Sequence, residues 1–159
     1  MERITVSDHS SHASAIWEGD LLTGGGSFQV GSRAAPRLPV TWKARTSSDD
    51  PLTSPEELIA AAHASCYSMA LSHGLASAGH TPERVATEAT VTFAEQEGGG
   101  WKISASHLKV RARVRGLDRA AFLKAAQEAK DGCPVSGALR GNLEITLDAD
   151  LEETELGGS

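Results

Sequence analysis

The chain has 159 residues, of which 40% are hydrophobic, and a formal net charge of −6 at pH 7. A chain of this length suits a single domain, residues 1–159, which can bury about 70% of its unfolded surface without a structural disulfide. The acidic balance argues against a nucleic-acid partner, and no segment approaches the roughly 18 apolar residues of a membrane span. Since the first residues also show no apolar leader, we expect a cytoplasmic protein without membrane contacts.

The first third of the chain predicts three short strands. Ala13–Trp17 and Ser27–Val30 are separated by the glycine-rich turn at residues 24–26, and Leu38–Lys43 is the third strand. Residues 45–54 are expected to form a loop, because this stretch is rich in serine, aspartate and proline.

A long helix is predicted from residue 55 to about residue 78. Ser54 provides an N-cap hydroxyl, Pro55 stands at the first helical position and Glu57 lies three residues after the cap. Gly79 marks the end of the helix. The segment is apolar on most of its faces, so we expect it to be buried and central.

The next two strands form a predicted antiparallel hairpin. Val85–Phe93 and Leu108–Val114 each alternate between apolar and polar residues, and three consecutive glycines lie between them. The second strand carries an outward row of basic residues, which we interpret as a solvated strand face rather than an anion-binding patch. This row consists of Lys109, Arg111, Arg113 and Arg115.

The last part of the chain predicts two short helices and one more strand. Asp118 can cap a helix that ends near residue 130, Pro134 begins another, and residues 143–147 alternate as a strand before a polar tail after about residue 151. Strands before and after one buried helix favour an α+β fold rather than a βαβ parallel sheet.

The chain contains two cysteines in different surroundings. Cys66 lies in the middle of the long helix, and Cys133 stands directly before Pro134, so the two thiols can meet only through the fold. In a reducing compartment such a pair is more often catalytic than structural, and it suits one thiol that oxidises and one that resolves it. The alternative is that Cys66 is simply a small apolar core residue, the commonest state of an isolated cysteine.

A metal site is the other interpretation of these residues. His63 and Cys66 lie on one helix face, with His73 further along, but the residues that follow Cys133 cannot ligate, so we predict neither a metal nor another cofactor. His63 could act as a base. We favour a structural role for it, since an ionised thiol needs a cation rather than a proton acceptor.

A nucleophilic Cys66 needs help to become a thiolate. It lies about a dozen residues from the start of its helix, whereas the helix dipole acts within about the first turn, and burial disfavours the charge. A guanidinium about 4 Å away, at an effective dielectric near 20, is worth about 4 kcal/mol. Arg45 is the nearest such group in the sequence, and Arg33 and Arg37 are the alternatives.

Two motifs resemble a known family. PEELIAAAHASCYSMAL at residues 55–71 and GCPVS at residues 132–136 are similar to segments of the osmotically inducible protein C (OsmC) family, a sister group of the organic hydroperoxide resistance proteins. WEGD at residues 17–20 and EITLD at residues 144–148 extend the resemblance over nearly the whole chain. It implies an OsmC-like fold, with antiparallel sheets around a long buried central helix, and an intertwined homodimer.

The resemblance also implies an activity, that of a thiol peroxidase acting on organic hydroperoxides in the response to oxidative and osmotic stress. By this resemblance Cys66 matches the peroxidatic cysteine and Cys133 the resolving cysteine, which form a disulfide. Arg45 matches the arginine that activates the thiolate, and Glu56 the carboxylate that orients this arginine. The disulfide would be recycled by a dithiol reductant such as a dihydrolipoyl group.

Helix geometry gives a separate reason to expect a dimer. Glu56 and Cys66 are ten residues apart, which on one helix means about 15 Å of rise and about 80° of azimuth. One arginine cannot easily contact both within a single subunit, so we expect a second chain with an antiparallel central helix to complete the site. The rival hypothesis is a non-catalytic module of the same fold that binds a small hydrophobic ligand or stress signal.

Overall fold

A computed structural model of the protein describes residues 8–153. These residues divide into two compact units at the junction between Ser54 and Pro55. The first unit contains three strands and a short helix, and the second contains three helices and three strands. Both cysteines belong to the second unit. The single domain expected from the chain length stays a prediction.

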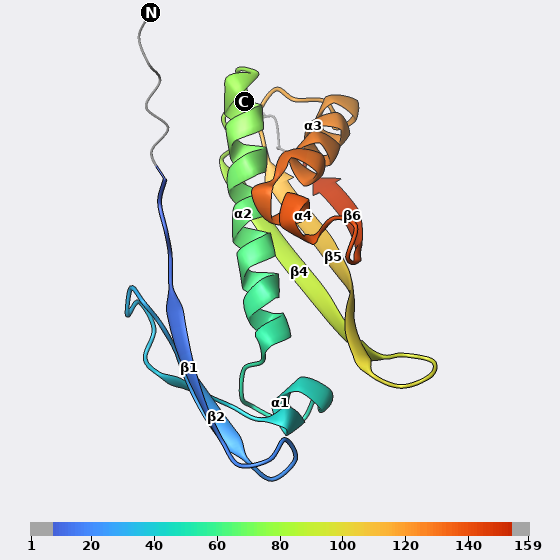
Figure 1. The fold of residues 1–159 in the computed structure, drawn as a ribbon. Coiled ribbons are helices and arrows are strands. Elements are labelled where there is room, and N and C mark those ends of the chain that lie inside the picture. Colours follow the sequence, from blue (N-terminus) through green and yellow to red (C-terminus); the bar gives the residue numbers. More distant parts are fainter. Residues whose placement is uncertain (1–7, 154–159) are drawn as a thin grey trace, which may run out of the picture. The chain divides into compact units, whose positions relative to one another are not determined.

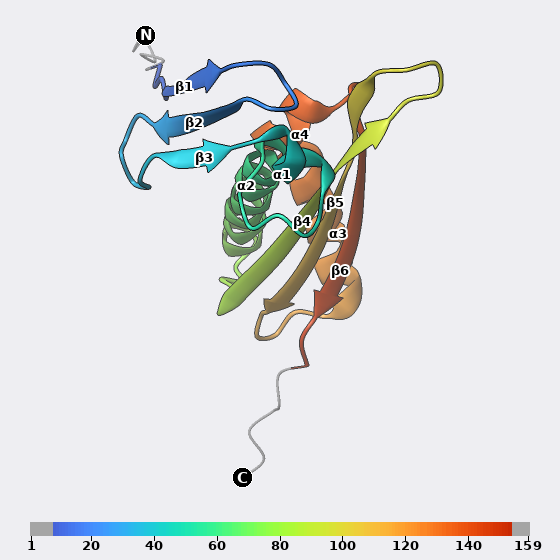
Figure 2. The ribbon, with the colours of Figure 1, turned by 90° about the horizontal axis from the view of Figure 1, so that it is seen from below.

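The first unit is built on a small antiparallel sheet. Strands β1 (Ala13–Glu18), β2 (Gly25–Val30) and β3 (Leu38–Val40) pair in the order β1-β2-β3, as Figure 2 shows. The carboxylate of Asp20 accepts hydrogen bonds from the backbone N–H of Thr23 at 2.7 Å and from that of Leu22. The Asp20 side chain therefore fixes the turn between β1 and β2. The first two predicted strands are confirmed, and the third is present only over Leu38–Val40.

A short helix replaces part of the predicted third strand and loop. The prediction that the strand reaches Lys43 is wrong, because helix α1 occupies Trp42–Thr46. The side-chain oxygen of Thr41 accepts a hydrogen bond from the N–H of Ala44 at 3.1 Å. It thereby caps one of the amide groups that the start of a helix leaves without a partner. This helix also takes Arg45 out of the predicted loop.

The second unit begins with the long helix α2, which runs over Pro55–Ser77 as predicted. Its end is also the predicted one, since Gly79 has a φ of +89°. The N–H of Gly79 donates to the carbonyl of Ala76 at 3.0 Å, and that of His80 donates to the carbonyl of Leu75 at 2.8 Å. These two bonds form a Schellman motif, which satisfies carbonyls in the last turn.

Within the single chain α2 buries only one of its apolar faces. Tyr67 and Leu71 are 0% exposed, whereas Met69 is 67% exposed and Leu58 is 40% exposed. The predicted burial of α2 thus holds on one side, and its other side presents apolar side chains on the surface.

The sheet of the second unit is mixed. Strands β4 (Arg84–Glu95) and β5 (Trp101–Arg113) form the predicted antiparallel hairpin, but β6 (Glu144–Leu151) pairs with β5 in parallel. The expectation of purely antiparallel sheets is wrong here. The reason is that α3 and α4 connect β5 to β6 and return the chain to the end of the sheet where β5 begins, as a parallel pair requires.

Helices α2 and α3 cover one face of this sheet (Figure 1). Helix α3 runs over Arg119–Gly132 and α4 over Pro134–Leu139. The predicted cap of α3 is confirmed, because the carboxylate of Asp118 accepts the N–H of Ala121 at 2.8 Å. The core lies between the helices and the sheet, and its largest apolar side chains are Tyr67, Leu71, Leu75, Leu108, Val110, Val114 and Phe122.

The opposite face of the sheet carries the basic row as a solvated surface, as predicted. Arg111 and Arg113 form ion pairs with Glu152 at 3.2 and 3.0 Å, and Lys109 stands opposite Glu88 in the register of the strands. The basic side chains are thus matched by acidic neighbours. No helix within residues 8–153 is long and apolar enough to cross a membrane.

Candidate functional site

The fold brings the two cysteines together. The Sγ atoms of Cys66 and Cys133 lie 3.1 Å apart, although the residues are separated by 67 positions, and both are free thiols. Cys66 lies in the middle of α2 and is half-buried, whereas Cys133 is only 1% exposed. A disulfide needs its sulfurs about 2.05 Å apart. A shift of about 1 Å would therefore join the two sulfurs.

Cys133 is held at a corner between two helices. It follows the last residue of α3 and precedes Pro134, the first residue of α4. Its backbone is extended, with φ −62° and ψ 125°, as the residue before a proline prefers. Its N–H still donates to the carbonyl of Ala129 at 2.9 Å, which ties the corner to α3.

The same corner brings a backbone group to Cys66. The N–H of Val135, in the first turn of α4, donates a hydrogen bond to the Cys66 sulfur. The start of α4 thus contacts Cys66 twice, once through the Cys133 thiol and once through this amide.

A buried histidine lies one helical turn before Cys66. His63 is 0% exposed, its Nδ1 lies 2.6 Å from the Oγ of Ser106 on β5, and its Nε2 lies 2.8 Å from the Oγ of Ser136 on α4. Burial lowers the pKa of His63 below its ordinary value of 6.5. The ring is therefore neutral at pH 7 and fully hydrogen-bonded, which is compatible with the structural role, and this role stays a prediction.

The two serines were not predicted from the sequence. Ser136 could have been found, because it follows Cys133 by three residues just as Cys66 follows His63 by three. Ser106 gives no such signal, since it is one of many small residues on an alternating strand. Among residues 8–153 no three His, Cys, Asp or Glu side chains are grouped so that they could hold a metal ion.

The surroundings of Cys66 within its own unit favour the protonated thiol. Burial raises the pKa of Cys66 above its ordinary value of 9.0, and the hydrogen bond and charge of Cys133 raise it further. The N–H of Val135 acts in the opposite direction. Nearby Tyr67 does not supply a charge, because burial, followed by the Cys133 charge, raises the pKa of its phenol and keeps it neutral. A reactive thiolate therefore needs a cation from elsewhere.

The predicted arginine and glutamate lie in different units. Glu56 is the second residue of α2 and is 5% exposed. Arg45 lies on α1 in the first unit, where its Cζ is 5.8 Å from the centre of the Trp42 ring. The pairing of Arg45 with Cys66, and of Glu56 with Arg45, stays a prediction.

The two alternative arginines also belong to the first unit. Arg37 donates from Nη1 to the Oγ of Ser27 at 3.0 Å, and Arg33 has a φ of +59° in the turn between β2 and β3. Both therefore have a place in the local structure of the small sheet.

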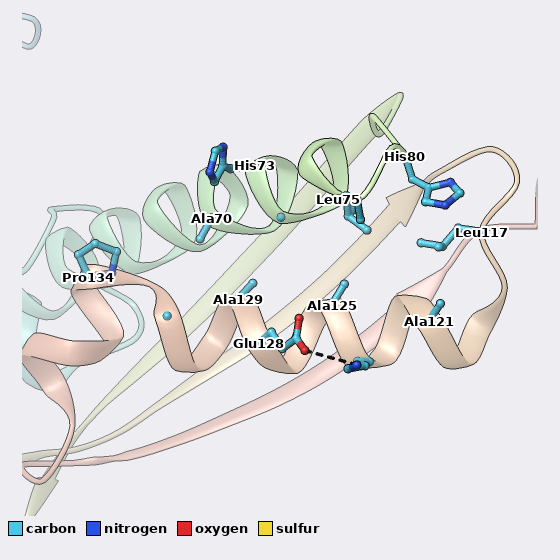
Figure 3. A pocket seen from close by; sticks show the side chains of 14 residues that line it. Ala70, His73, Leu75, His80, Leu117, Ala121, Ala125, Glu128, Ala129 and Pro134 are labelled. Atoms are coloured by element: carbon cyan, nitrogen blue, oxygen red, sulfur yellow. Dashed lines mark ion pairs between the residues drawn. The ribbon is translucent and has the colours of Figure 1, made fainter.

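A groove of about 620 Å³ runs between α2 and α3 (Figure 3). Its lining is mostly small and apolar, and Lys124 and Glu128 of α3 form an ion pair at 3.9 Å within it. At one end lie Ala70, one turn after Cys66, and Pro134, next to Cys133. The groove thus includes sequence neighbours of both cysteines in its lining, although neither cysteine lines it.

Comparisons with known proteins agree with this architecture. The family model described as "OsmC-like protein" matches residues 47–148. The chain is 41% identical to the protein named Peroxiredoxin OsmC from Escherichia coli K12, over 87% of this chain and 94% of that protein. It is 31% identical to an organic hydroperoxide resistance protein of Xanthomonas axonopodis pv. citri, over 60% of this chain and 65% of that protein.

A solved structure shares the fold at lower identity. The crystal structure of an organic hydroperoxide resistance protein from Elizabethkingia anophelis superimposes with a TM-score of 0.72 at 22% identity, covering 92% of this chain and 99% of that chain. The α+β fold with its long helix is thus an OsmC-like fold. With a family model spanning residues 47–148 and a relative 41% identical over most of both chains, the protein belongs to the OsmC-like protein family.

Proposed function

We propose that this protein is a thiol-dependent peroxidase that reduces organic hydroperoxides to alcohols. The observation that carries the proposal is the 3.1 Å separation of the Cys66 and Cys133 sulfurs, two free thiols that no structural role requires to meet. The names of the relatives in Escherichia coli and Xanthomonas axonopodis, a peroxiredoxin and an organic hydroperoxide resistance protein, support the same activity.

The proposed reaction has three steps. The Cys66 thiolate attacks the terminal peroxide oxygen, so the O–O bond breaks, Cys66 becomes a sulfenic acid, and the alkoxide takes up a proton to leave as an alcohol. The Cys133 thiol then attacks the sulfenic sulfur, and water leaves as the disulfide forms. A dithiol reductant, such as a dihydrolipoyl group, exchanges with this disulfide and leaves both cysteines reduced, so no other cofactor is needed.

Arg45 and Glu56 complete the proposed site. Because burial raises the pKa of Cys66, the thiolate needs a nearby cation, and Arg45 would provide it. The carboxylate of Glu56 would hold this guanidinium in position through charge-assisted hydrogen bonds.

The proposed active form is an intertwined homodimer. Glu56 and Cys66 are separated along α2 by about 15 Å of rise, more than one guanidinium can bridge. The exposed apolar side of α2, with Met69 at 67% exposure, supports a second α2 packed against it. Each site would then combine groups from two chains.

The groove between α2 and α3 suits the organic part of the substrate. Its small apolar side chains leave room for an alkyl chain, and its lining includes Ala70 and Pro134, which are close to the cysteines in the sequence. An alkyl group in this groove would favour organic hydroperoxides over hydrogen peroxide.

Cysteine variants test the proposal. The reduced protein is mixed with tert-butyl hydroperoxide and dihydrolipoamide, and loss of peroxide is followed for the wild type, Cys66→Ser and Cys133→Ser. We expect turnover by the wild type and none by Cys66→Ser. The Cys133→Ser variant should consume peroxide to oxidise Cys66 and then lack the disulfide route for recycling.

The same experiment separates the proposal from its rival. Turnover that persists in Cys66→Ser, or a wild type that consumes no peroxide, would contradict the peroxidase assignment. A wild type that binds an alkyl hydroperoxide without reducing it would favour the binding module.

A further inference from the structure

Two pairs of side chains join α2 to α4 with the same spacing. On α2, His63 and Cys66 are three residues apart, and Cys133 and Ser136 at the start of α4 are also three apart. His63 contacts Ser136 at 2.8 Å, and Cys66 contacts Cys133 at 3.1 Å. The His63–Ser136 contact therefore lies about one helical turn from the contact between the sulfurs, on α2 and on α4 alike.

The histidine is itself anchored on its other side. Its Nδ1 lies 2.6 Å from the hydroxyl of Ser106, which belongs to the central strand β5 of the sheet. His63, Ser106 and Ser136 are all 0% exposed, so water does not compete for these hydrogen bonds. A buried and fully paired network of this kind is rigid and costly to disrupt.

Helix α4 depends on such an anchor for its position. It has six residues, Pro134–Leu139, too few to form a stable helix on its own. Ser136 is the only one of these six that is buried. Loss of the His63–Ser136 contact would therefore loosen the start of α4 next to Cys133, whose N–H bond to Ala129 would still tie it to α3.

From these contacts we propose that His63 is a positioning residue for the resolving step: through Ser136 it holds α4 so that the Cys133 sulfur stays within reach of oxidised Cys66. This inference rests on the proposed peroxidase function and adds a residue to it. The step is the loss of water between the Cys66 sulfenic acid and the Cys133 thiol, which forms one S–S bond.

Positioning matters at this step because a competing reaction exists. A sulfenic acid that is not resolved can react with a second peroxide and become a sulfinic acid, which a dithiol does not reduce. Holding two reacting groups together raises their effective concentration and hence the rate of the intramolecular reaction. Without the His63–Ser136 contact, more Cys66 should be lost to overoxidation.

The test compares two matched serine variants. Ser136→Ala removes the hydrogen bond to α4, and Ser106→Ala removes the hydrogen bond to the sheet, so each leaves one ring nitrogen of His63 without its partner. The first readout needs no peroxide: the equilibrium of the Cys66–Cys133 disulfide in a glutathione redox buffer gives the effective concentration of the two thiols. The second is the ratio of sulfinic acid to disulfide at Cys66 after treatment with tert-butyl hydroperoxide, measured by mass spectrometry.

We expect Ser136→Ala to lower the effective concentration by about five- to tenfold, the worth of one buried hydrogen bond, and to raise the sulfinic fraction. Ser106→Ala should stay within about twofold of the wild type in both readouts, since the contact with α4 remains. Equal changes in the two variants, or an unchanged effective concentration in Ser136→Ala, would overturn the proposal.

Substitutions of His63 provide a rescue experiment. A glutamine side chain can place its amide near the position of Nε2 and so reach Ser136, whereas an asparagine amide lies near the position of Nδ1 and reaches only Ser106. We expect His63→Gln to keep the effective concentration of the two thiols close to that of the wild type and His63→Asn to lower it about as much as Ser136→Ala does. If His63 only stabilised the fold, the two variants would not differ in this order. Wild-type disulfide formation in His63→Asn would overturn the inference.

The two readouts also separate this inference from the function on which it rests. A wild type that forms the disulfide in the redox buffer but consumes no peroxide would contradict the peroxidase function alone. A wild type that turns over peroxide, with Ser136→Ala indistinguishable from it, would contradict the positioning role alone.

Discussion

Cys66 is subject to opposing influences on its charge. Burial and the neighbouring Cys133 raise the pKa of its thiol, and the N–H of Val135 lowers it. The protein thus partly shields the sulfur from water at the cost of the thiolate that the proposed chemistry needs. A nearby guanidinium would resolve this conflict, because it would stabilise the thiolate without donating or accepting a proton at neutral pH.

The proposed role of Arg45 leads to a prediction about pH. Arg45→Met removes the charge and keeps most of the apolar stem, so the pKa of Cys66 should rise. Since only the thiolate reacts, the midpoint of Cys66 alkylation by iodoacetamide should move to higher pH, and the rate at pH 7 should fall about tenfold for each 1.4 kcal/mol of lost stabilisation. The measurement is the alkylation rate as a function of pH in a Cys133→Ser background.

Arg37→Met is the matched control for this prediction. It removes an arginine of the same unit that donates to Ser27, and it should leave the alkylation profile unchanged. If Arg37→Met or Arg33→Met shifts the profile and Arg45→Met does not, another arginine activates Cys66.

Two glycines, one inside α2 and one just after it, show how local sequence determines the structure. The helix stops because Gly79 adopts a φ of +89° and allows the two closing hydrogen bonds. Gly74, by contrast, lies inside the helix, and an added Cβ would meet nothing within 4 Å. The glycine inside the helix and the glycine just after it thus have opposite conformational demands.

Substitution by alanine should therefore have opposite effects at these positions. Gly79→Ala forces a side chain into a left-handed conformation and should cost about 1–2 kcal/mol of stability. Gly74→Ala removes backbone freedom from the unfolded chain and should add up to about 1 kcal/mol. Urea unfolding of the two variants measures both values, and destabilisation of similar size by both would contradict the argument.

This contrast explains how much of the fold the sequence could predict. The limits of α2 and the start of α3 were predicted because proline, aspartate and glycine act within a few residues of their own position. The direction of β6 was not predictable in this way. Alternation at residues 143–147 identifies a strand, but its parallel pairing with β5 follows from the path of α3 and α4. Helix α1 begins after the cap residue Thr41, inside a segment whose sequence pattern predicts a strand.

The candidate site also combines residues that the sequence identifies with residues that only the fold brings in. The two cysteines could be recognised from their motifs, and their approach to 3.1 Å follows from the packing of α4 on α2. Ser106 could not be recognised, because its role depends on which residue of β5 faces His63, and that is set by the register of the whole sheet.

The proposed site would be complete only in the proposed homodimer. One chain leaves Met69 and Leu58 exposed on the helix that carries Cys66, and an apolar helix face of this kind is typical of an interface between subunits. In a two-fold symmetric dimer each chain would give Cys66 to one site and Arg45 to the other. The arrangement can be tested without knowing beforehand which chain supplies Arg45 to a given Cys66.

Mixed dimers provide the test. Arg45→Met and Cys66→Ser chains with different affinity tags are expressed together, and the heterodimer is isolated by two successive purifications. If Arg45 acts on the cysteine of the other chain, one site of this heterodimer combines an intact Cys66 with an intact Arg45, and it should show about half the activity of the wild-type dimer. Each parent homodimer should be nearly inactive, and a heterodimer of wild-type and Cys66→Ser chains calibrates the value expected for one working site.

The opposite arrangement gives a different result. If Arg45 acts within its own chain, both sites of the mixed dimer are defective, one in its arginine and the other in its cysteine, and the heterodimer should be as inactive as its parents. Failure to isolate any heterodimer would contradict the homodimer itself. Restored activity would show that the cation that Cys66 needs comes from the second chain, since the only intact Arg45 in that dimer belongs to the chain without the cysteine.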